Sequence, residues 1–149
     1  MRYLILFLSF FVLIACGGYS EFQNKATQNY SDEEMQKFAK YMIQGKSLYK
    51  AYCSNCHQED GSGLGKVYPP IMGSDYLLQE DVDLACIIKN GLEGSITVKQ
   101  VTYDQAMPAN DELSDLEIAE LCTYVMNSFG FEKGIYTIQN INTSLQECQ

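Results

Sequence analysis

The 149-residue sequence contains no tryptophan, only three prolines and a single histidine, His57. Without a second histidine, any metal bound by His57 must find its other ligands among different residue types. Basic residues are also few, with ten Lys and Arg against nineteen Asp and Glu, which gives a net charge of −9. Nucleic-acid binding depends on a basic surface, so this composition excludes nucleic acid as a partner.

The sequence also lacks an apolar run of the ~20 residues that a membrane-spanning helix needs. Its longest run, residues 3–15, follows one arginine and ends in small residues, which is typical of a cleaved signal peptide. The letters LIAC at its end resemble a bacterial lipobox, so we predict a lipoprotein signal peptide over residues 1–15 and lipid attachment at Cys16. The alternative is an ordinary signal peptide cut near Gly17, with Cys16 discarded.

Lipidation of Cys16 would anchor the mature protein, because several acyl chains bind a bilayer stably and a single chain does so only marginally. We therefore expect the protein on the periplasmic side of a bacterial membrane, held there by its N-terminal lipid. Residues 16–30 are polar and without helical periodicity, which predicts a flexible tether. Loss of residues 1–15 leaves nine basic and nineteen acidic side chains, a net charge of −10.

Two capping boxes predict the first and last helices of the domain. Ser31 and Glu34 precede apolar residues at three-to-four spacing, so a helix is expected to run into Cys53. Ser114 and Glu117 predict the last helix in the same way.

Loops dominate the chain between these two helices. A helix is expected over residues 81–90, with Gly91 as its C-cap residue. Residues 59–73 and 91–110 contain all three prolines and should be loops, the second with a short extended piece around residues 96–101. We expect an all-α domain over residues 31–130 with three to five helices, and a C-terminal tail, residues 131–149, packed on it. Such long loops need something else to organise them.

The stretch AYCSNCHQ, residues 51–58, places Cys53, Cys56 and His57 within five positions. This Cys-x-x-Cys-His pattern is the signal for covalent haem attachment, in which two thiols bind the haem and the imidazole supplies an axial ligand. One alternative is a thioredoxin-like dithiol, but that motif normally follows a strand and this one follows a predicted helix. The other is structural zinc, which would need a fourth ligand from a distant cysteine and which the adjacent Cys56 and His57 fit poorly in spacing.

The iron ligand opposite His57 must be a methionine or a weaker group, because the chain has no second histidine. Met72 and Met107 are the methionines that lie in loops after the motif. Met107 ends a loop long enough to wrap the ring, whereas Met72 has only a short path from His57 to the opposite face. Pro108 also restricts the backbone of Met107 to extended geometry. We therefore predict His57 and Met107 as the iron ligands.

With these residues, the sequence resembles the class I c-type cytochromes, specifically the small bacterial monohaem type with a Met-Pro ligand loop. The resemblance covers about residues 40–130 and includes the stretches YPPIMG and MPAN. It implies the cytochrome c fold, with long loops wrapped around one covalently bound haem c. It further implies that the Pro69 carbonyl accepts a hydrogen bond from His57 Nδ1–H, and that Ile71 touches the porphyrin.

The same resemblance implies that Gly45 of the first helix packs against Tyr124 of the last. One position departs from the family, which more often has an aromatic residue or glycine where Asn110 stands.

A haem with both axial positions filled transfers single electrons and offers no position for a substrate. The predicted function is a monomeric single-electron carrier, not an enzyme, that passes electrons between respiratory redox proteins on the outer side of the cytoplasmic membrane. Thioether ligation favours Fe(II), so a positive midpoint potential is expected. The alternatives are a haem-bearing docking subunit of a respiratory or nitrite-reducing complex, and a gas-binding or peroxidatic haem protein with a labile Met107.

Three cysteines remain besides Cys16 and the two of the motif. Helical phase turns Cys86 away from the apolar stripe of its helix, whereas Cys122 belongs to the buried face of the last helix. In an oxidising compartment we predict a Cys86–Cys148 disulfide that fastens the tail, with Cys122 free. The alternative is that Cys148 stays free or pairs between molecules.

Overall fold

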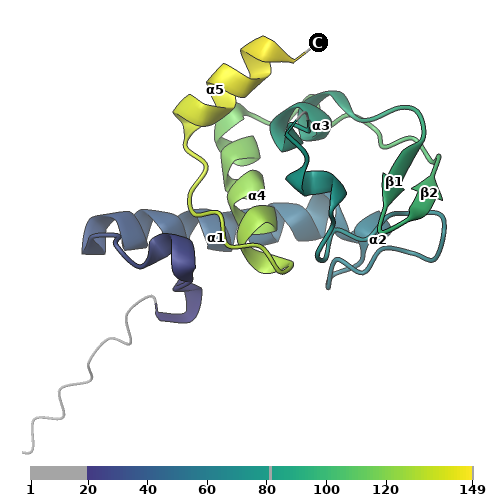
Figure 1. Ribbon diagram of the computed structural model, residues 1–149. Helices are drawn as coiled ribbons and strands as arrows, with labels where there is room; N and C mark the ends of the chain where they lie inside the picture. Colours follow the sequence, from purple (N-terminus) through teal and green to yellow (C-terminus); the bar gives the residue numbers. More distant parts are fainter. Residues whose placement is uncertain (1–19, 81, 149) are drawn as a thin grey trace, which may run out of the picture.

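The computed structural model describes residues 20–80 and 82–148, and it is mostly helical (Figure 1). The described residues form α1 (Asp32–Tyr52), α2 (Ser54–His57), α3 (Leu84–Asn90), α4 (Asp115–Ser128) and α5 (Ile138–Glu147). They also form three 3-10 helices, η1 (Ser20–Phe22), η2 (Lys25–Thr27) and η3 (Tyr76–Leu78). The expected all-α class is confirmed. The predicted signal peptide and Cys16 lie outside the described residues.

None of the helices in the described ranges combines the length and the apolar composition that a bilayer-spanning segment needs.

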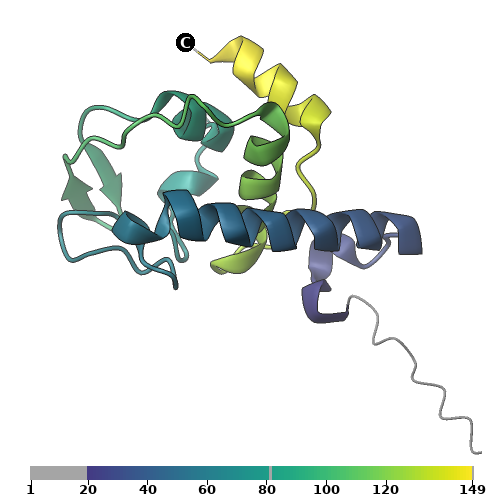
Figure 2. The ribbon, with the colours of Figure 1, turned by 180° about the vertical axis from the view of Figure 1, so that it is seen from behind.

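Helices α1 and α4 cross at the centre of the fold (Figure 2). Both begin at the predicted capping boxes, Ser31 with Glu34 and Ser114 with Glu117. At the crossing, a Cβ atom on Gly45 would collide with the Glu120 carbonyl oxygen and would lie 2.6 Å from Tyr124 Cβ. Only glycine allows this approach, so the implied contact between the first and last helices is present.

The main core surrounds α4. Its buried members on and just before this helix include the apolar residues Leu113, Ile118, Ala119, Leu121, Cys122 and Val125. Burial of such side chains stabilises the fold by roughly 25 cal/mol per Å² of apolar area removed from water. Helix α3 packs on this core through Ala85 and Ile88. Helix α3 is shorter than the expected 81–90, because Asp83 caps it by accepting from the backbone of Ala85 and Cys86.

A β-hairpin occupies the stretch where a short extended piece was expected. Strands β1 (Ile96–Val98) and β2 (Val101–Tyr103) pair antiparallel, with Ile96 opposite Tyr103. The turn residues Lys99 and Gln100 have φ values of 49° and 66°. Such two-residue turns usually carry Asn-Gly, and strands of three residues are too short to show a two-residue period. These two facts explain why the sequence did not predict a hairpin.

Residues 20–30 fold onto the domain, which differs from the flexible tether expected over residues 16–30. The Asn24 side-chain amide donates to Asn127 Oδ1 at 3.0 Å, and the Tyr30 hydroxyl accepts from the Ile135 backbone N–H at 3.0 Å. Phe22 and Tyr30 pack on a second apolar cluster formed by Met35, Phe38 and Met42. The difference arises because Asn24 and Tyr30 find partners more than 100 positions away in the sequence. Residues 16–19 lie outside the described part.

The C-terminal tail contains helix α5, which contacts α3 and α4. Thr137 caps α5 with Asn140 as its partner, a weaker sequence signal than Ser with Glu. Ile141 of α5 is fully buried in the main core. A disulfide joins Cys148 to Cys86 of α3, with a Cα–Cα distance of 5.6 Å, and Cys122 is a free, buried thiol.

Candidate functional site

The Cys-x-x-Cys-His motif lies where α1 ends and the short α2 follows. Cys53 caps α1 by donating its backbone N–H to the Tyr49 carbonyl at 2.9 Å. The Cys53 carbonyl then accepts the backbone N–H groups of Cys56 at 3.2 Å and His57 at 2.9 Å. This single tight turn brings both thiols and the imidazole to the wall of one cavity.

The walls of this cavity are mostly apolar and come from the motif, residues 68–71 and 74–77, α3, the hairpin, the loop around Met107 and α4. Leu84, Ile87 and Ile88, the predicted apolar stripe of α3, all line it. Leu84 and Ile87 are half-buried, and both line this cavity. Ile71 lies on the wall as well, at the position that the resemblance implied.

The His57 ring is held through Nδ1, which lies 3.0 Å from the Pro69 carbonyl oxygen. Donation from Nδ1 leaves the Nε2 lone pair available to a metal. Burial lowers the pKa of His57, against the opposite effect of the Pro69 hydrogen bond, so the neutral, ligand-competent imidazole is favoured at pH 7. Gly63 allows the loop to approach, because a Cβ there would lie 2.8 Å from the Pro69 carbonyl oxygen.

The Cys53 thiol does not have the character of a reactive dithiol cysteine. Burial, and next the charge of Cys56, raises the pKa of Cys53 to about 12, whereas reactive dithiols have lowered pKa values. Structural zinc also fails, because the described residues contain no group of three His, Cys, Asp or Glu side chains placed to hold a metal ion.

Met107 is the methionine that lines the cavity. Its backbone pairs with that of Leu92: the Leu92 N–H donates to the Met107 carbonyl at 3.0 Å, and the Met107 N–H donates to the Leu92 carbonyl at 2.9 Å. Met72 is 45% exposed and is not part of the cavity wall. The remaining described methionines are buried in the two apolar clusters.

The loop that carries Met107 is fastened to α3 by residues that no sequence motif predicted. Gly91, at φ +78°, has no room for a side chain, because a Cβ would lie 2.5 Å from the Met107 carbonyl oxygen. Asn110 donates its backbone N–H to the Ile88 carbonyl at 3.1 Å and its side-chain amide to the same oxygen at 3.3 Å. Asn110, unusual for the family, therefore holds the loop that carries Met107 against α3.

The donor set fits a covalently attached haem. Two thiols stand beside an imidazole whose Nε2 is available, a thioether lies on the same cavity, and the remaining lining is largely apolar. This combination matches the ligands and low-polarity surroundings that c-type haem requires.

Comparisons with known proteins give the same result. Residues 42–129, more than half of the chain, match the family model Cytochrome c, and the chain belongs to this family. It is 32% identical over 95 residues to cytochrome c-552 of Thermus thermophilus, which covers 61% of this chain and 72% of that protein. The resemblance to c-type cytochromes and the cytochrome c fold are therefore confirmed.

Two larger proteins also match. The chain is 25% identical over 146 residues to the cytochrome c subunit of a quinone alcohol dehydrogenase from Gluconobacter oxydans, covering 76% of this chain and 30% of that subunit. It is 31% identical over 90 residues to the cytochrome subunit of a fructose dehydrogenase from Gluconobacter japonicus, covering 58% of this chain and 18% of the subunit. The chain thus spans less than a third of either subunit. Family membership supports covalent haem c and haem-based electron transfer.

Proposed function

We propose that this chain is a single-electron carrier with one haem c, attached through Cys53 and Cys56 and ligated by His57 and Met107. One observation carries the ligand assignment: of the two loop methionines, Met107 lines the cavity that the motif lines, and Met72 is exposed outside it. The sequence contains a single Cys-x-x-Cys-His motif, which supports one haem.

The bound haem supplies a one-electron Fe(II)/Fe(III) couple. His57, oriented by the Pro69 carbonyl, would provide a nitrogen ligand whose tautomer that hydrogen bond fixes. The Met107 thioether favours the reduced state, and the apolar walls do the same because they disfavour added positive charge. If His57 and Met107 both hold the iron, the haem would supply single-electron transfer rather than substrate chemistry.

The carrier works between redox proteins on the periplasmic side of a bacterial membrane, as a monomer anchored through lipid on Cys16. The signal-peptide pattern and the lipobox-like LIAC letters support this location. The second candidate is a haem-bearing subunit fixed in a larger complex, which the similarity to dehydrogenase cytochrome subunits supports. Native-size analysis of detergent extracts separates the two, because a fixed subunit migrates with its complex.

The ligand assignment is tested with Met107→Ala and, as a matched control, Met72→Ala, both produced in a host that matures c-type cytochromes. A pyridine haemochrome assay counts haem, and the oxidised spectrum reports the weak far-red band of iron–sulfur ligation. Met107→Ala should lose this band, become high-spin and bind CO, whereas Met72→Ala should match the parent protein. A parent protein that is already high-spin and binds CO favours the gas-binding alternative, and a colourless folded parent rejects the proposal.

Replacement of the ligand by a stronger nitrogen donor gives a second readout. Met107→His should lower the midpoint potential by an amount on the order of 0.1 V. This is a fraction of the roughly 0.8 V range over which axial ligands set haem potentials. An unchanged potential would show that Met107 does not bind the iron.

A further inference from the structure

The residue that directly follows the motif, Gln58, has a backbone conformation that residues with a side chain rarely adopt. Its φ is 64° and its ψ is 159° at the point where α2 ends. This region of φ and ψ is populated almost only by glycine, because a Cβ atom collides there with the neighbouring backbone. A glutamine in this conformation is strained, and the strain lies one residue from His57, the imidazole that we propose as an iron ligand.

Strain of this kind persists only where surrounding contacts hold the residue in place. The φ and ψ angles of Gln58 join two peptide planes, and both planes are hydrogen-bonded. The carbonyl of the first plane, that of His57, accepts the Gly63 backbone N–H at 2.9 Å. The carbonyl of the second plane, that of Gln58, accepts the Gly61 backbone N–H at 3.1 Å and the Tyr49 hydroxyl at 2.7 Å. Relaxation of Gln58 therefore requires the loss of at least one of these hydrogen bonds.

Tyr49 is the hydrogen-bond partner of Gln58 that comes from the core. It is 2% exposed, and its ring contacts those of Tyr124 and Phe129, with centroids 5.6 and 5.0 Å away. Burial, more than the neighbouring charges, raises the pKa of Tyr49, so the hydroxyl keeps the proton that it donates. A rigidly packed ring thus brings a permanent donor to the Gln58 carbonyl.

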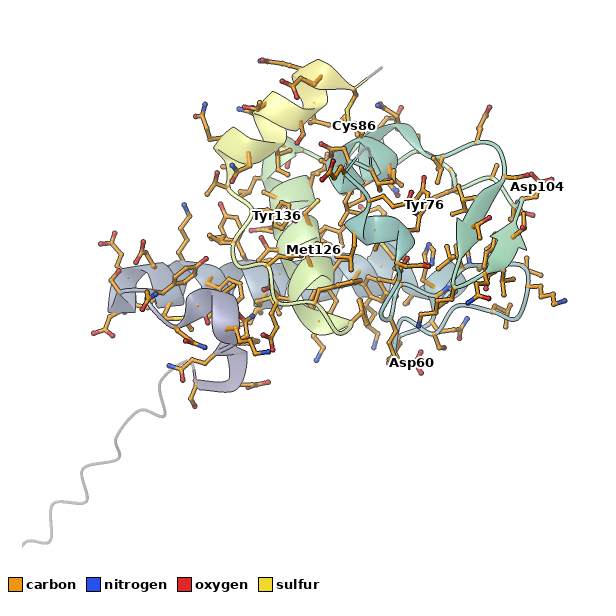
Figure 3. All side chains as sticks on the ribbon, in the orientation of Figure 1. Asp60, Tyr76, Cys86, Asp104, Met126 and Tyr136 are labelled. Atoms are coloured by element: carbon orange, nitrogen blue, oxygen red, sulfur yellow. A yellow bond between two sulfur atoms is a disulfide. The ribbon has the colours of Figure 1, made fainter. Side chains whose placement is uncertain are left out.

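The turn that Gln58 begins reaches the surface. Asp60 is exposed and lies at the outer edge of the molecule in Figure 3. Its Oδ1 accepts the Ser62 backbone N–H at 2.9 Å, which is a contact within the turn. The bond from Gly61 to Gln58 is local in the same way, whereas the Tyr49 hydroxyl ties the Gln58 carbonyl to helix α1.

The same turn reaches the His57 ring through Gly63. The Gly63 N–H donates to the His57 carbonyl, and a Cβ atom on Gly63 would lie 2.8 Å from the Pro69 carbonyl oxygen. That oxygen lies 3.0 Å from His57 Nδ1. A shift of the turn would therefore displace both the backbone of His57 and the acceptor that orients its ring.

We propose that Tyr49 is a positioning residue for the axial imidazole: its hydroxyl holds Gln58 in the strained conformation, and the turn fixed in this way sets the orientation of the His57 ring. The role of Tyr49 rests on the proposed ligation of the iron by His57. Loss of the hydroxyl lets Gln58 relax, and the His57 ring then turns relative to the porphyrin. In Gln58→Gly there is no strain to release, so loss of the hydroxyl has less effect on the ring.

The strain is tested by comparing Gln58→Gly with Gln58→Ala in the haem-loaded protein. Both variants remove the glutamine side chain, but Gln58→Ala keeps the Cβ atom. At an unstrained position a glycine variant is the less stable of the two, because glycine makes the unfolded chain more flexible. Here the order should be reversed, and Gln58→Gly should unfold at a higher urea concentration than Gln58→Ala. The ordinary order would overturn the proposal, because Gln58 would then hold no strain.

The positioning role is tested with Tyr49→Phe, alone and combined with Gln58→Gly. Tyr41→Phe is the matched control, since Tyr41 is a buried tyrosine of the same helix whose ring centroid lies 5.7 Å from Lys37 Nζ. Electron paramagnetic resonance of the oxidised, low-spin haem gives g values that vary with the orientation of the axial imidazole plane. These g values should shift in Tyr49→Phe and stay at those of the parent protein in Tyr41→Phe.

The double variant separates release of strain from loss of a hydrogen bond. Tyr49→Phe should shift the g values less in the Gln58→Gly background than in the parent protein, because the two changes are coupled through one strained residue. Parent g values in Tyr49→Phe, or equal shifts in both backgrounds, would overturn the assignment. Failure of the proposed function is distinguishable, because the parent protein itself would then lack haem or the far-red band.

Discussion

Gly45 determines, at the scale of a single residue, how closely α1 and α4 approach. Helix α1 ends at the motif, so any displacement of α1 also displaces Cys53 and the part of the cavity wall that Cys53 forms. Tyr49, one turn further along α1, is 2% exposed and contacts the rings of Tyr124 and Phe129, with centroids 5.6 and 5.0 Å away. The Tyr49 hydroxyl also donates to the Gln58 carbonyl at 2.7 Å, just after the motif. The crossing and the haem site are thus one packed unit.

Gly45→Ala should destabilise the protein by about 1–3 kcal/mol, because overpacking forces the two helices apart. The added methyl group would collide with the Glu120 carbonyl, a backbone atom that cannot move without its helix. Urea unfolding of the haem-loaded protein measures the change. Ser47→Ala, an exposed position on the same helix, should stay within about 0.5 kcal/mol of the parent. Equal midpoints for the two variants would contradict this account of the crossing.

At the scale of elements, the Cys86–Cys148 disulfide joins α5 to α3, the helix whose opposite side lines the haem cavity. It closes a loop with a sequence separation of 62 residues. A disulfide that closes a loop of this length stabilises the folded state by about 4 kcal/mol, because it lowers the conformational entropy of the unfolded chain. Ile141 keeps α5 in the core without the disulfide, since it is 1% exposed.

The double variant Cys86→Ser, Cys148→Ser should therefore lose up to about 4 kcal/mol of stability and keep the parent haem spectrum. Chemical unfolding and the far-red band measure the two effects. Thiol alkylation checks the pairing in the parent protein. Burial raises the pKa of Cys122, so no cysteine of the folded, haem-loaded protein should be alkylated. After unfolding without reduction, Cys122 alone should be alkylated. Alkylation of Cys86 or Cys148 without reduction would refute the pairing.

The capping box of α4 predicts a pH dependence of stability. Hydrogen bonds from the Ser114 hydroxyl and backbone N–H lower the pKa of Glu117 below its usual value. A folded-state pKa below the unfolded one adds stability above the unfolded pKa, and this stability is lost as pH falls through the folded pKa. Glu117→Gln should thus be less stable than the parent at pH 7, and the difference should shrink below about pH 4. Urea midpoints measured at pH 7 and below about pH 4 test this prediction. Glu112→Gln, at an exposed site outside the capping box, should differ from the parent protein by the same small amount at both pH values.

The sequence predicted elements whose signals are local. The Ser31 and Ser114 capping boxes are readable because both partners lie within four residues, and α1 and α4 begin where expected. The motif is equally local, since one turn holds Cys53, Cys56 and His57. The hairpin and α5 were missed because short strands and a Thr137–Asn140 cap give weak local patterns.

The rest of the candidate site depends on contacts between distant segments. Met107 could be inferred from chain reach, but its backbone pairing with Leu92 and the hydrogen bonds from Asn110 to Ile88 could not. Lys99 in the hairpin turn donates to Asp75 and to the Met72 carbonyl, and no spacing in the sequence expresses that contact.

At the scale of the whole molecule, α1 separates the N-terminal segment from the haem site. Figures 1 and 2 both show residues 20–30 beside the N-terminal half of α1, with the hairpin beyond its other end. A helix of 21 residues is about 30 Å long at 1.5 Å per residue. If Cys16 carries lipid as proposed, the four residues 16–19 reach at most roughly 14 Å before the folded part begins. The haem site is then held at the end of α1 remote from the anchor.

This arrangement requires residues 20–30 to be part of the folded domain rather than a tether. Their removal would uncover Phe38, which is fully buried, and leave the Ile135 backbone N–H without the Tyr30 hydroxyl. Contact between the rings of Tyr30 and Phe38, edge to face at a centroid distance of 5.9 Å, would be lost as well. The ordering entropy of the segment offsets part of this loss, because each ordered residue costs about 1–2 kcal/mol.

A non-lipidated secreted variant that begins at Ser31 should therefore be about 1–3 kcal/mol less stable than one that begins at Ser20, with the same haem spectrum. Urea midpoints of the two haem-loaded proteins give the comparison. A variant that begins at Gly17 is the matched control and should unfold at the same urea concentration as the one that begins at Ser20. If all three midpoints coincide, residues 20–30 act as a tether after all, and the haem site is free to approach the membrane.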